Sequence, residues 1–213
     1  MAVATPKEPK SPFLVYQDFI SPKLCDQILS KIVVKEPTLD DDGFAIKMER
    51  FNAESQDIIF SKFKELVPEI EQHYNLKYRG TEEILFQYFP LSKGLAEEPN
   101  CANSKFLRKK WVKIKDRDIT GILWFKDYND QVPIDIQTEV YGGKLEFPQY
   151  NFSLHPQRGT LILFPAYPHF VTAISQILVG ELYCARFQIS AEQWLYQPAD
   201  FPGTWAEWFK EFA

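Results

Sequence analysis

Cysteine is scarce in this chain, and long apolar runs are missing. Only Cys25, Cys101 and Cys184 occur among 213 residues. They are odd in number, lie far apart and share no CxxC spacing, so we expect neither a disulfide framework nor a zinc site. No apolar run approaches the roughly 20 residues that span a bilayer, and residues 1–10 lack the apolar core of a signal peptide. We therefore expect a protein of a reducing compartment that is not secreted and does not contact a membrane.

An excess of positive charge is also missing. The sequence has 24 Lys and Arg against 29 Asp and Glu, which gives a net charge of −5, and we find no long block of either sign. Nucleic-acid partners are therefore not expected, because they need a basic footprint. Glycine is rare as well, with nine residues against eighteen phenylalanines. This composition and length indicate one globular, strand-rich domain.

The first part of the chain carries helix signals. Ser21 is a good N-cap and Pro22 suits the first helical position, so we predict a helix over residues 21–32. A second amphipathic stripe predicts a helix over residues 55–74, with a kink at Pro68. We interpret the later "KDRD" stretch, residues 115–118, as a solvated loop with local ion pairs.

The remainder of the chain is dominated by short strand signals separated by turns. Alternating or continuous apolar segments rich in β-branched and aromatic residues predict strands at residues 13–20, 84–89, 110–115, 119–125, 144–148, 159–165 and 182–189. The predicted fold class is mainly β with flanking helices (α+β). It is an antiparallel sandwich or barrel with two N-terminal helices packed on one face.

We divide the chain into three parts. Residues 1–12 are expected to be a flexible arm, and residues 13–190 form the domain. Residues 191–213 contain Trp and Phe at helical spacing, which predicts a short helix docked on the body. An anchor for a partner protein is the alternative interpretation of this aromatic tail.

Two motifs carry a family resemblance. "GGKLEFP", residues 142–148, and "PQRGTLILFP", residues 156–165, are followed by a strand entered after Gly180. Over residues 13–190 the chain resembles the Fe(II)/2-oxoglutarate dioxygenase superfamily, in particular prolyl 4-hydroxylases, whose relatives are also common in phage genomes. The resemblance implies a double-stranded β-helix, or jelly roll. Gly142 and Gly143 would then form a turn, while Phe147 and Phe164 would fill the barrel.

Activity in that family requires two histidines and a carboxylate on Fe(II), the first pair spaced His-x-Asp or His-x-Glu so that both residues share a strand face. The chain has three histidines, His73, His155 and His169. None is followed two residues later by a carboxylate. We expect His73 at a helix end and His155 in a turn.

The resemblance also indicates where the metal ligands would fall. It assigns Asn100 and Ala102 to the first ligand pair and Thr172 to the distal histidine. His169 comes three residues too early and would point away from the pocket if the strand is extended. A site rebuilt from His155, His169 and a carboxylate such as Glu146 or Asp118 remains open at this point. We therefore predict degenerate ligand positions, with no metal bound and no catalytic residue.

The cosubstrate position departs from the family pattern as well. Where the resemblance places a basic residue that binds the distal carboxylate of 2-oxoglutarate, this chain has Leu182, and Arg186 lies four residues further on the same strand face. Arg186, Leu182, His169 and Tyr88 are our candidates for a pocket. The alternative for Arg186 is an ion pair with a surface or pocket-edge carboxylate.

These departures predict a non-catalytic, dioxygenase-like jelly roll that acts as a structural or binding module without cofactors, a pseudoenzyme. The phage relatives suggest a virion component of the tail, neck or baseplate. The alternative is an active dioxygenase that uses Fe(II) and 2-oxoglutarate to hydroxylate prolyl or other peptide side chains. A third possibility is a barrel that binds a small ligand. We expect protein partners, for which a larger assembly is one setting, and a location in the cytoplasm or the virion.

Overall fold

The computed structural model describes residues 11–32, 47–50, 53–155 and 157–192. Nearly all of the predicted arm and tail lies outside these residues. In the part of the chain that is described, no helix is both long and apolar enough to cross a membrane.

Both predicted helices are confirmed. Helix α1 (Pro22–Ser30) begins where Ser21 Oγ accepts a hydrogen bond from the backbone N–H of Leu24 at 3.3 Å. Helix α2 (Ala53–Tyr74) begins two residues earlier than predicted and runs through Pro68 as one element. The helical bounds are therefore set mainly by local signals in the sequence.

The largest sheet has seven strands in the order β1-β13-β8-β16-β4-β2, with β3 also paired to β16. Its pairings are antiparallel throughout. The strands are β1 (Leu14–Tyr16), β2 (Lys47–Arg50), β3 (Tyr78–Thr81), β4 (Leu85–Phe89), β8 (Ile119–Trp124), β13 (Leu161–Pro165) and β16 (Leu182–Ala191).

Three smaller sheets complete the described strands. The second sheet has the order β12-β11-β14-β5, the third has the order β15-β10-β9, and β6 and β7 form a hairpin. These strands are β5 (Glu97–Asn100), β6 (Ser104–Leu107), β7 (Lys110–Lys113), β9 (Asp127–Asn129), β10 (Glu139–Gly142), β11 (Leu145–Phe147), β12 (Phe152–Leu154), β14 (Thr172–Ile174) and β15 (Ile177–Val179). Two 3₁₀ turns are η1 (Pro148–Tyr150) and η2 (Pro168–Phe170).

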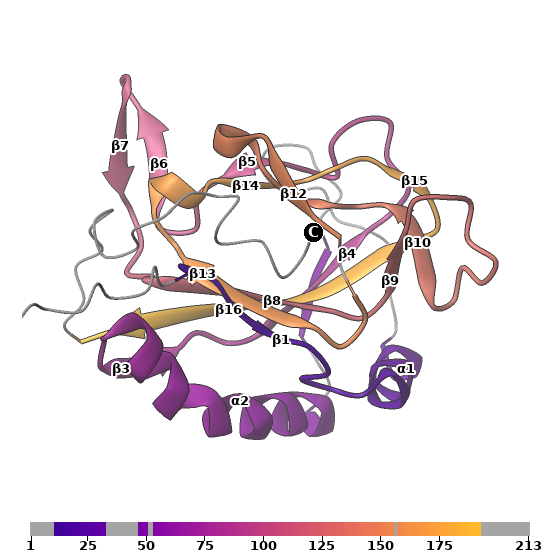
Figure 1. Ribbon diagram of the computed structural model, residues 1–213, viewed down its shortest axis with the longest axis horizontal. Coiled ribbons are helices and arrows are strands. Elements are labelled where there is room, and N and C mark those ends of the chain that lie inside the picture. Colours follow the sequence, from indigo (N-terminus) through magenta and orange to yellow (C-terminus); the bar gives the residue numbers. More distant parts are fainter. Residues whose placement is uncertain (1–10, 33–46, 51–52, 156, 193–213) are drawn as a thin grey trace, which may run out of the picture.

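The large sheet separates two apolar layers. Figure 1 shows α1 and α2 along one face of the sheet and strands β5, β14, β12 and β10 along the other. One buried cluster joins the helices to the sheet and contains Phe63 and Phe187. The other fills the space between the sheets and contains Trp124. Two sheets closed face to face, with helices on one outer face, form the predicted jelly roll.

The glycine turn and the aromatic barrel filling are confirmed. Gly142 and Gly143 have φ of +89° and +75°, and a Cβ on Gly142 would lie 2.1 Å from the carbonyl oxygen of Gln176. Only glycine fits such a turn without strain. Phe147 and Phe164 both lie in the buried cluster between the sheets.

The prediction of a solvated loop at residues 115–118 is wrong for its last residue. Asp118 is buried, and its carboxylate accepts hydrogen bonds from the hydroxyl of Tyr167 and the backbone N–H of Ala191, both at 2.8 Å. Asp116 does form a local ion pair, with Lys113, whereas Arg117 pairs with Glu82 from a distant segment of the chain. The aspartate thus fastens β16 to the start of β8.

Candidate functional site

The predicted ligand positions meet at the ends of two strands of the second sheet. Asn100 is the last residue of β5 and Thr172 is the first of β14, and the two are direct partners across the strands. Ala102 lies beyond the end of β5, where its carbonyl accepts a hydrogen bond from Arg117 Nη1 at 3.2 Å. The structure therefore brings Asn100 and Thr172 together and leaves Ala102 outside the strand.

These side chains do not fit an Fe(II) ion. An amide and a hydroxyl stand opposite each other, whereas the family chemistry needs two imidazoles and a carboxylate. Among the residues that the structure describes, no group of three or more His, Cys, Asp or Glu is placed to hold a metal ion. No chemical step through iron can be derived from this arrangement.

Arg186 lies inside the barrel, where it is paired with a carboxylate of the same chain. Arg186 Nη1 and Nη2 donate to Glu97 Oε1 and Oε2 at 3.0 and 2.8 Å. The two side chains are 11% and 7% exposed. Burial alone would lower the pKa of Arg186, but the attraction and hydrogen bonds of Glu97 outweigh it and raise that pKa. Such a two-point pair between a guanidinium and a carboxylate is strong and directional.

The geometry of β5 explains how Glu97 reaches Arg186. Glu97 is paired with Ile174 of β14, and Ile174 belongs to the apolar cluster inside the barrel. On β16, Cys184 belongs to the same cluster, and Arg186 follows on the same strand face. Both charges therefore project into the space between the sheets. Glu97 lies three residues before Asn100, beside the predicted ligand positions.

Further polar side chains line this end of the barrel and satisfy one another. Thr120 Oγ1 donates to Gln188 Oε1 at 3.1 Å, and the thiol of Cys184 lies 3.7 Å from Gln87 Oε1. All four residues are buried. Burial raises the pKa of the Cys184 thiol to about 12, so it stays protonated at neutral pH. Arg186 Nε is a buried nitrogen without a hydrogen-bond partner among the described residues.

The other residues of the predicted pocket lie elsewhere. Leu182 is fully buried in the apolar cluster of the barrel. Tyr88 is the strand partner of Tyr183, and its hydroxyl donates to Glu181 Oε1 at 2.7 Å. Because neighbouring residues alternate between faces, Tyr88 and Tyr183 lie on the sheet face opposite to Cys184 and Arg186. His169 is exposed in η2.

The three histidines are dispersed. His155 is exposed and stacks on Tyr128 with ring centroids 4.4 Å apart, and burial and the charge of Lys144 lower its pKa. His73 Nε2 is 2.9 Å from the carbonyl oxygen of Ser11. The extended geometry assumed for His169 is wrong, because β14 begins only at Thr172. In the described part of the chain, His155 and His169 do not join a carboxylate in a metal cluster.

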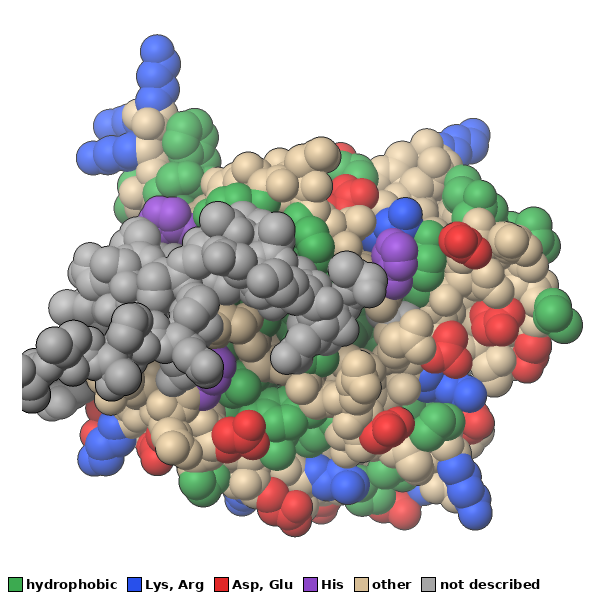
Figure 2. All heavy atoms as spheres, viewed as in Figure 1, with side chains coloured by type: hydrophobic (Ala, Val, Ile, Leu, Met, Phe, Trp, Pro, Cys, Tyr) green, Lys and Arg blue, Asp and Glu red, His purple; other side chains and the backbone are tan. Residues whose placement is uncertain are grey.

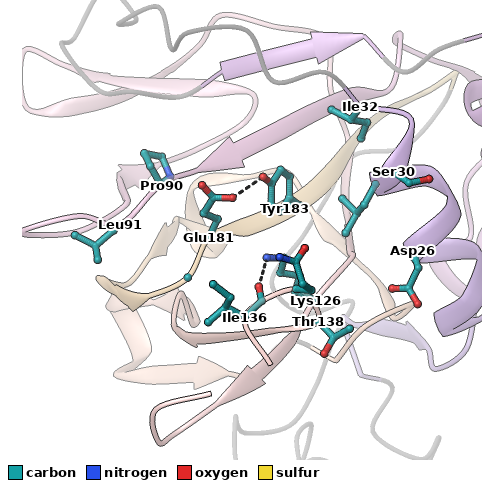
Figure 3. A pocket seen from close by; sticks show the side chains of 13 residues that line it. Asp26, Ser30, Ile32, Pro90, Leu91, Lys126, Ile136, Thr138, Glu181 and Tyr183 are labelled. Atoms are coloured by element: carbon teal, nitrogen blue, oxygen red, sulfur yellow. Dashed lines mark hydrogen bonds between the residues drawn. The ribbon is translucent and has the colours of Figure 1, made fainter. Parts of the chain in front are cut away.

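A cavity of about 830 Å³ opens between α1, the end of β4 and the start of β16. Figure 3 shows Lys126 and Glu181 projecting into it. Lys126 Nζ donates to the carbonyl of Ile136 at 2.7 Å, while Glu181 accepts the hydroxyl of Tyr183 at 2.7 Å. Burial lowers the pKa of Lys126. Because these polar groups are already bonded within the protein, we assign them a structural role.

Two features escaped the sequence reasoning. Glu97 sits in "EEPN", which has no strand signal of its own, and its partner is 89 residues away. The second feature is the basic character of the hairpin of β6 and β7: the strand at β7 was predicted, but the run of basic residues in "KFLRKKWVKIK" was not noticed. The balanced overall charge hid this run from an argument based on composition.

Comparison with known proteins gives the fold and nothing finer. No family model matches the sequence, and no curated protein matches it. Solved structures do match. The viral collagen prolyl hydroxylase of Paramecium bursaria Chlorella virus-1, in its 2OG complex, gives a TM-score of 0.58 at 15% identity over 85% of this chain and 96% of that chain.

Two further structures, from a bacterium and an animal, agree. A Pseudomonas putida prolyl-4-hydroxylase gives a TM-score of 0.57 at 15% identity, covering 86% of this chain and 94% of its own. The Trichoplax adhaerens prolyl hydroxylase, in complex with a hypoxia inducible factor oxygen degradation domain peptide fragment, gives 0.61 at 13% identity, with 85% and 84% covered. The chain therefore has the jelly-roll fold of prolyl 4-hydroxylases.

Proposed function

We propose that this protein is a non-catalytic member of this fold that serves as a structural or protein-binding module. The observation that carries the proposal is the buried two-point pair of Glu97 and Arg186. The carboxylate of Glu97 takes the hydrogen bonds that a basic residue of the barrel would otherwise offer to an anionic cosubstrate. Asn100 and Thr172, at the expected ligand positions, support the same conclusion because neither is a good ligand for Fe(II).

The alternative is an active dioxygenase with unusual ligands. It is favoured by the fold, since the solved structures that it resembles are named as prolyl hydroxylases and one holds 2OG. Under this alternative, Arg186 would release Glu97 and bind the cosubstrate. The narrower suggestion of a phage virion component stays a prediction.

Two measurements on the purified full chain separate these functions. The first titrates Fe(II) and 2-oxoglutarate by calorimetry, and the second follows the conversion of 2-oxoglutarate to succinate with a proline-rich peptide present. We expect neither stoichiometric iron nor turnover. Iron bound one to one together with succinate formation would overturn the proposal.

A variant series tests the role of Glu97 directly. In Glu97→Ala the carboxylate is removed, so we expect added acetate or 2-oxoglutarate to bind Arg186 and raise the melting temperature. The matched control is Glu98→Ala, because Glu98 is an exposed neighbour, whereas the guanidinium of Arg186 donates to Glu97. Equal responses of the two variants to these anions would contradict the proposal that Glu97 takes the place of an anionic cosubstrate on Arg186.

A further inference from the structure

The hairpin formed by β6 and β7 stands away from the body of the protein. In the described part of the chain these strands pair only with each other, and Figure 1 shows them projecting beyond the sheets. The base of the hairpin is fixed by the buried Asn103. Its carbonyl accepts the backbone N–H groups of Ile114 and Lys115, and its side chain donates to the carbonyl of Arg117 at 3.1 Å. The projection is therefore anchored in one orientation.

Large apolar side chains are exposed on this hairpin. Phe106 is 60% exposed, Leu107 47% and Trp111 37%. Phe106 and Trp111 are partners across the strands, with ring centroids 5.4 Å apart. None of them belongs to the two buried clusters of the described residues. Aromatic residues exposed together in this way are typical of surfaces that bind a partner.

The same hairpin is strongly basic. Residues 103–115 contain six Lys or Arg and no acid, and Figure 2 shows a group of basic side chains at the projecting tip, beside hydrophobic ones. Lys113 is bound to Asp116 at 3.2 Å. The other cations of the strands and turn have no carboxylate partner among the described residues; they are Lys105, Arg108, Lys109 and Lys110.

Two basic residues occupy the turn at the tip, although its backbone conformation is unfavourable for them. Arg108 and Lys109 have φ of +49° and +65°, the left-handed geometry that a two-residue hairpin turn requires. Asn-Gly is the preferred pair there, and a residue other than glycine held in this region costs on the order of 1 kcal/mol. Long basic side chains thus occupy positions where the turn alone would favour other residues.

We propose that residues 103–115, the basic hairpin, are a docking element for an acidic surface of a partner protein. Lys105, Leu107 and Lys110 lie on one face, and Phe106 and Trp111 lie on the other. The first face carries positive charge beside its apolar side chain, and the aromatic face adjoins the cations at the tip. This combination suits a groove with an apolar floor and carboxylates at its rim. This inference goes beyond the proposed function and holds whether or not the barrel is catalytic.

Charge favours a protein partner over a nucleic acid or a membrane. With the six cations of the basic hairpin set aside, the chain has 18 basic against 29 acidic side chains. A long polyanion or an anionic bilayer would extend past the hairpin and come within the Debye length, about 8 Å at physiological salt, of this acidic body. A groove that encloses only the hairpin avoids that repulsion.

The test measures binding of the full chain to three probes. The first is a fluorescent peptide in which glutamate alternates with leucine, the second is a single-stranded oligothymidine, and the third is a vesicle of phosphatidylcholine with phosphatidylserine. Anisotropy and co-sedimentation give the affinities at low and physiological salt. We expect the acidic peptide to bind most tightly, with an affinity that falls as salt is added.

Variants locate the binding. Lys105→Gln/Lys109→Gln/Lys110→Gln should weaken the peptide at least tenfold, and Phe106→Ser should weaken it without changing the salt dependence. The matched control is Lys23→Gln/Lys62→Gln/Lys93→Gln, which removes three exposed cations outside the hairpin. The proposal is overturned if the peptide does not bind, if the control loses as much affinity, or if the oligonucleotide or the vesicle binds more tightly. Thermal unfolding verifies that each variant is folded.

Discussion

Removal of Glu97 should destabilise the protein strongly, because it leaves the guanidinium of Arg186 buried and uncompensated. The two side chains are 7% and 11% exposed, so water solvates the remaining guanidinium poorly. Breaking a buried pair from one side costs about 3–5 kcal/mol. For a domain of this size roughly 2–4 °C of melting temperature corresponds to each kcal/mol. Glu97→Gln is therefore expected to melt roughly 6–20 °C below the wild type.

The double variant Glu97→Leu/Arg186→Met separates the pair from the packing around it. Replacing both charges by apolar groups of similar size removes the two desolvation costs together, so its stability should be close to that of the wild type or above it. Urea unfolding of the wild type, of Glu97→Leu, of Arg186→Met and of the double variant gives the coupling energy. Glu98→Gln, at an exposed neighbour, should change stability by less than about 0.5 kcal/mol.

Two results would refute this reasoning. If Glu97→Gln is as stable as the wild type, water reaches Arg186 and the pair is not buried in solution. If the losses of the two single variants add up in the double variant, Glu97 and Arg186 do not interact. Rescue of Glu97→Ala by acetate, and not by chloride at equal ionic strength, would support an accessible cationic site at the same place.

Three further predictions follow from single contacts. Gly142→Ala should lower stability by about 2 kcal/mol or more, because φ is positive and the added Cβ would meet the carbonyl of Gln176; thermal unfolding measures it, and an unchanged melting temperature would contradict the turn geometry. Between pH 9 and pH 12 only the native state keeps Cys184 protonated, so the free energy of unfolding should be constant in this respect below pH 9 and fall toward pH 12. Cys184→Ala should remove roughly 1 kcal/mol per pH unit of this slope in urea titrations. An unchanged slope would show that the thiol is not its cause. Trp111→Ser should alter stability by less than about 0.5 kcal/mol, because Trp111 lies outside the buried clusters of the described residues; a larger loss would mean that the basic hairpin supports the fold.

The parts of the fold that follow from local chemistry could be predicted from the sequence. The cap at Ser21 is set by residues close in the chain and was predicted from them. The glycine turn at Gly142 was implied by the family resemblance, and the structure confirms it. Strands β8 and β13 are nearly continuous apolar segments. By contrast, β5 has the sequence "EEPN" and becomes a strand only because its backbone pairs with β14. No local propensity predicts a strand of that kind.

The candidate site was predictable to a similar extent. The family resemblance assigned Asn100 and Thr172 to ligand positions, and the structure places them opposite each other. The sequence could not identify Glu97 as the partner of Arg186, because a pairing across 89 residues depends on the register of two sheets. The basic hairpin was readable as a run of cations, but only its position outside the core reveals that its apolar residues are exposed.

The position of β16 in the large sheet has a consequence for synthesis of the protein. This strand lies between β8 and β4, yet it is the last strand of the described chain. Until residues 182–191 have left the ribosome, β4 has no neighbour that joins it to β8. Pairings between such distant segments form slowly, and a nascent chain that waits for them exposes strand edges and apolar faces. The large sheet should therefore form only after β16 has left the ribosome, and the demand for chaperones should be greatest up to that point.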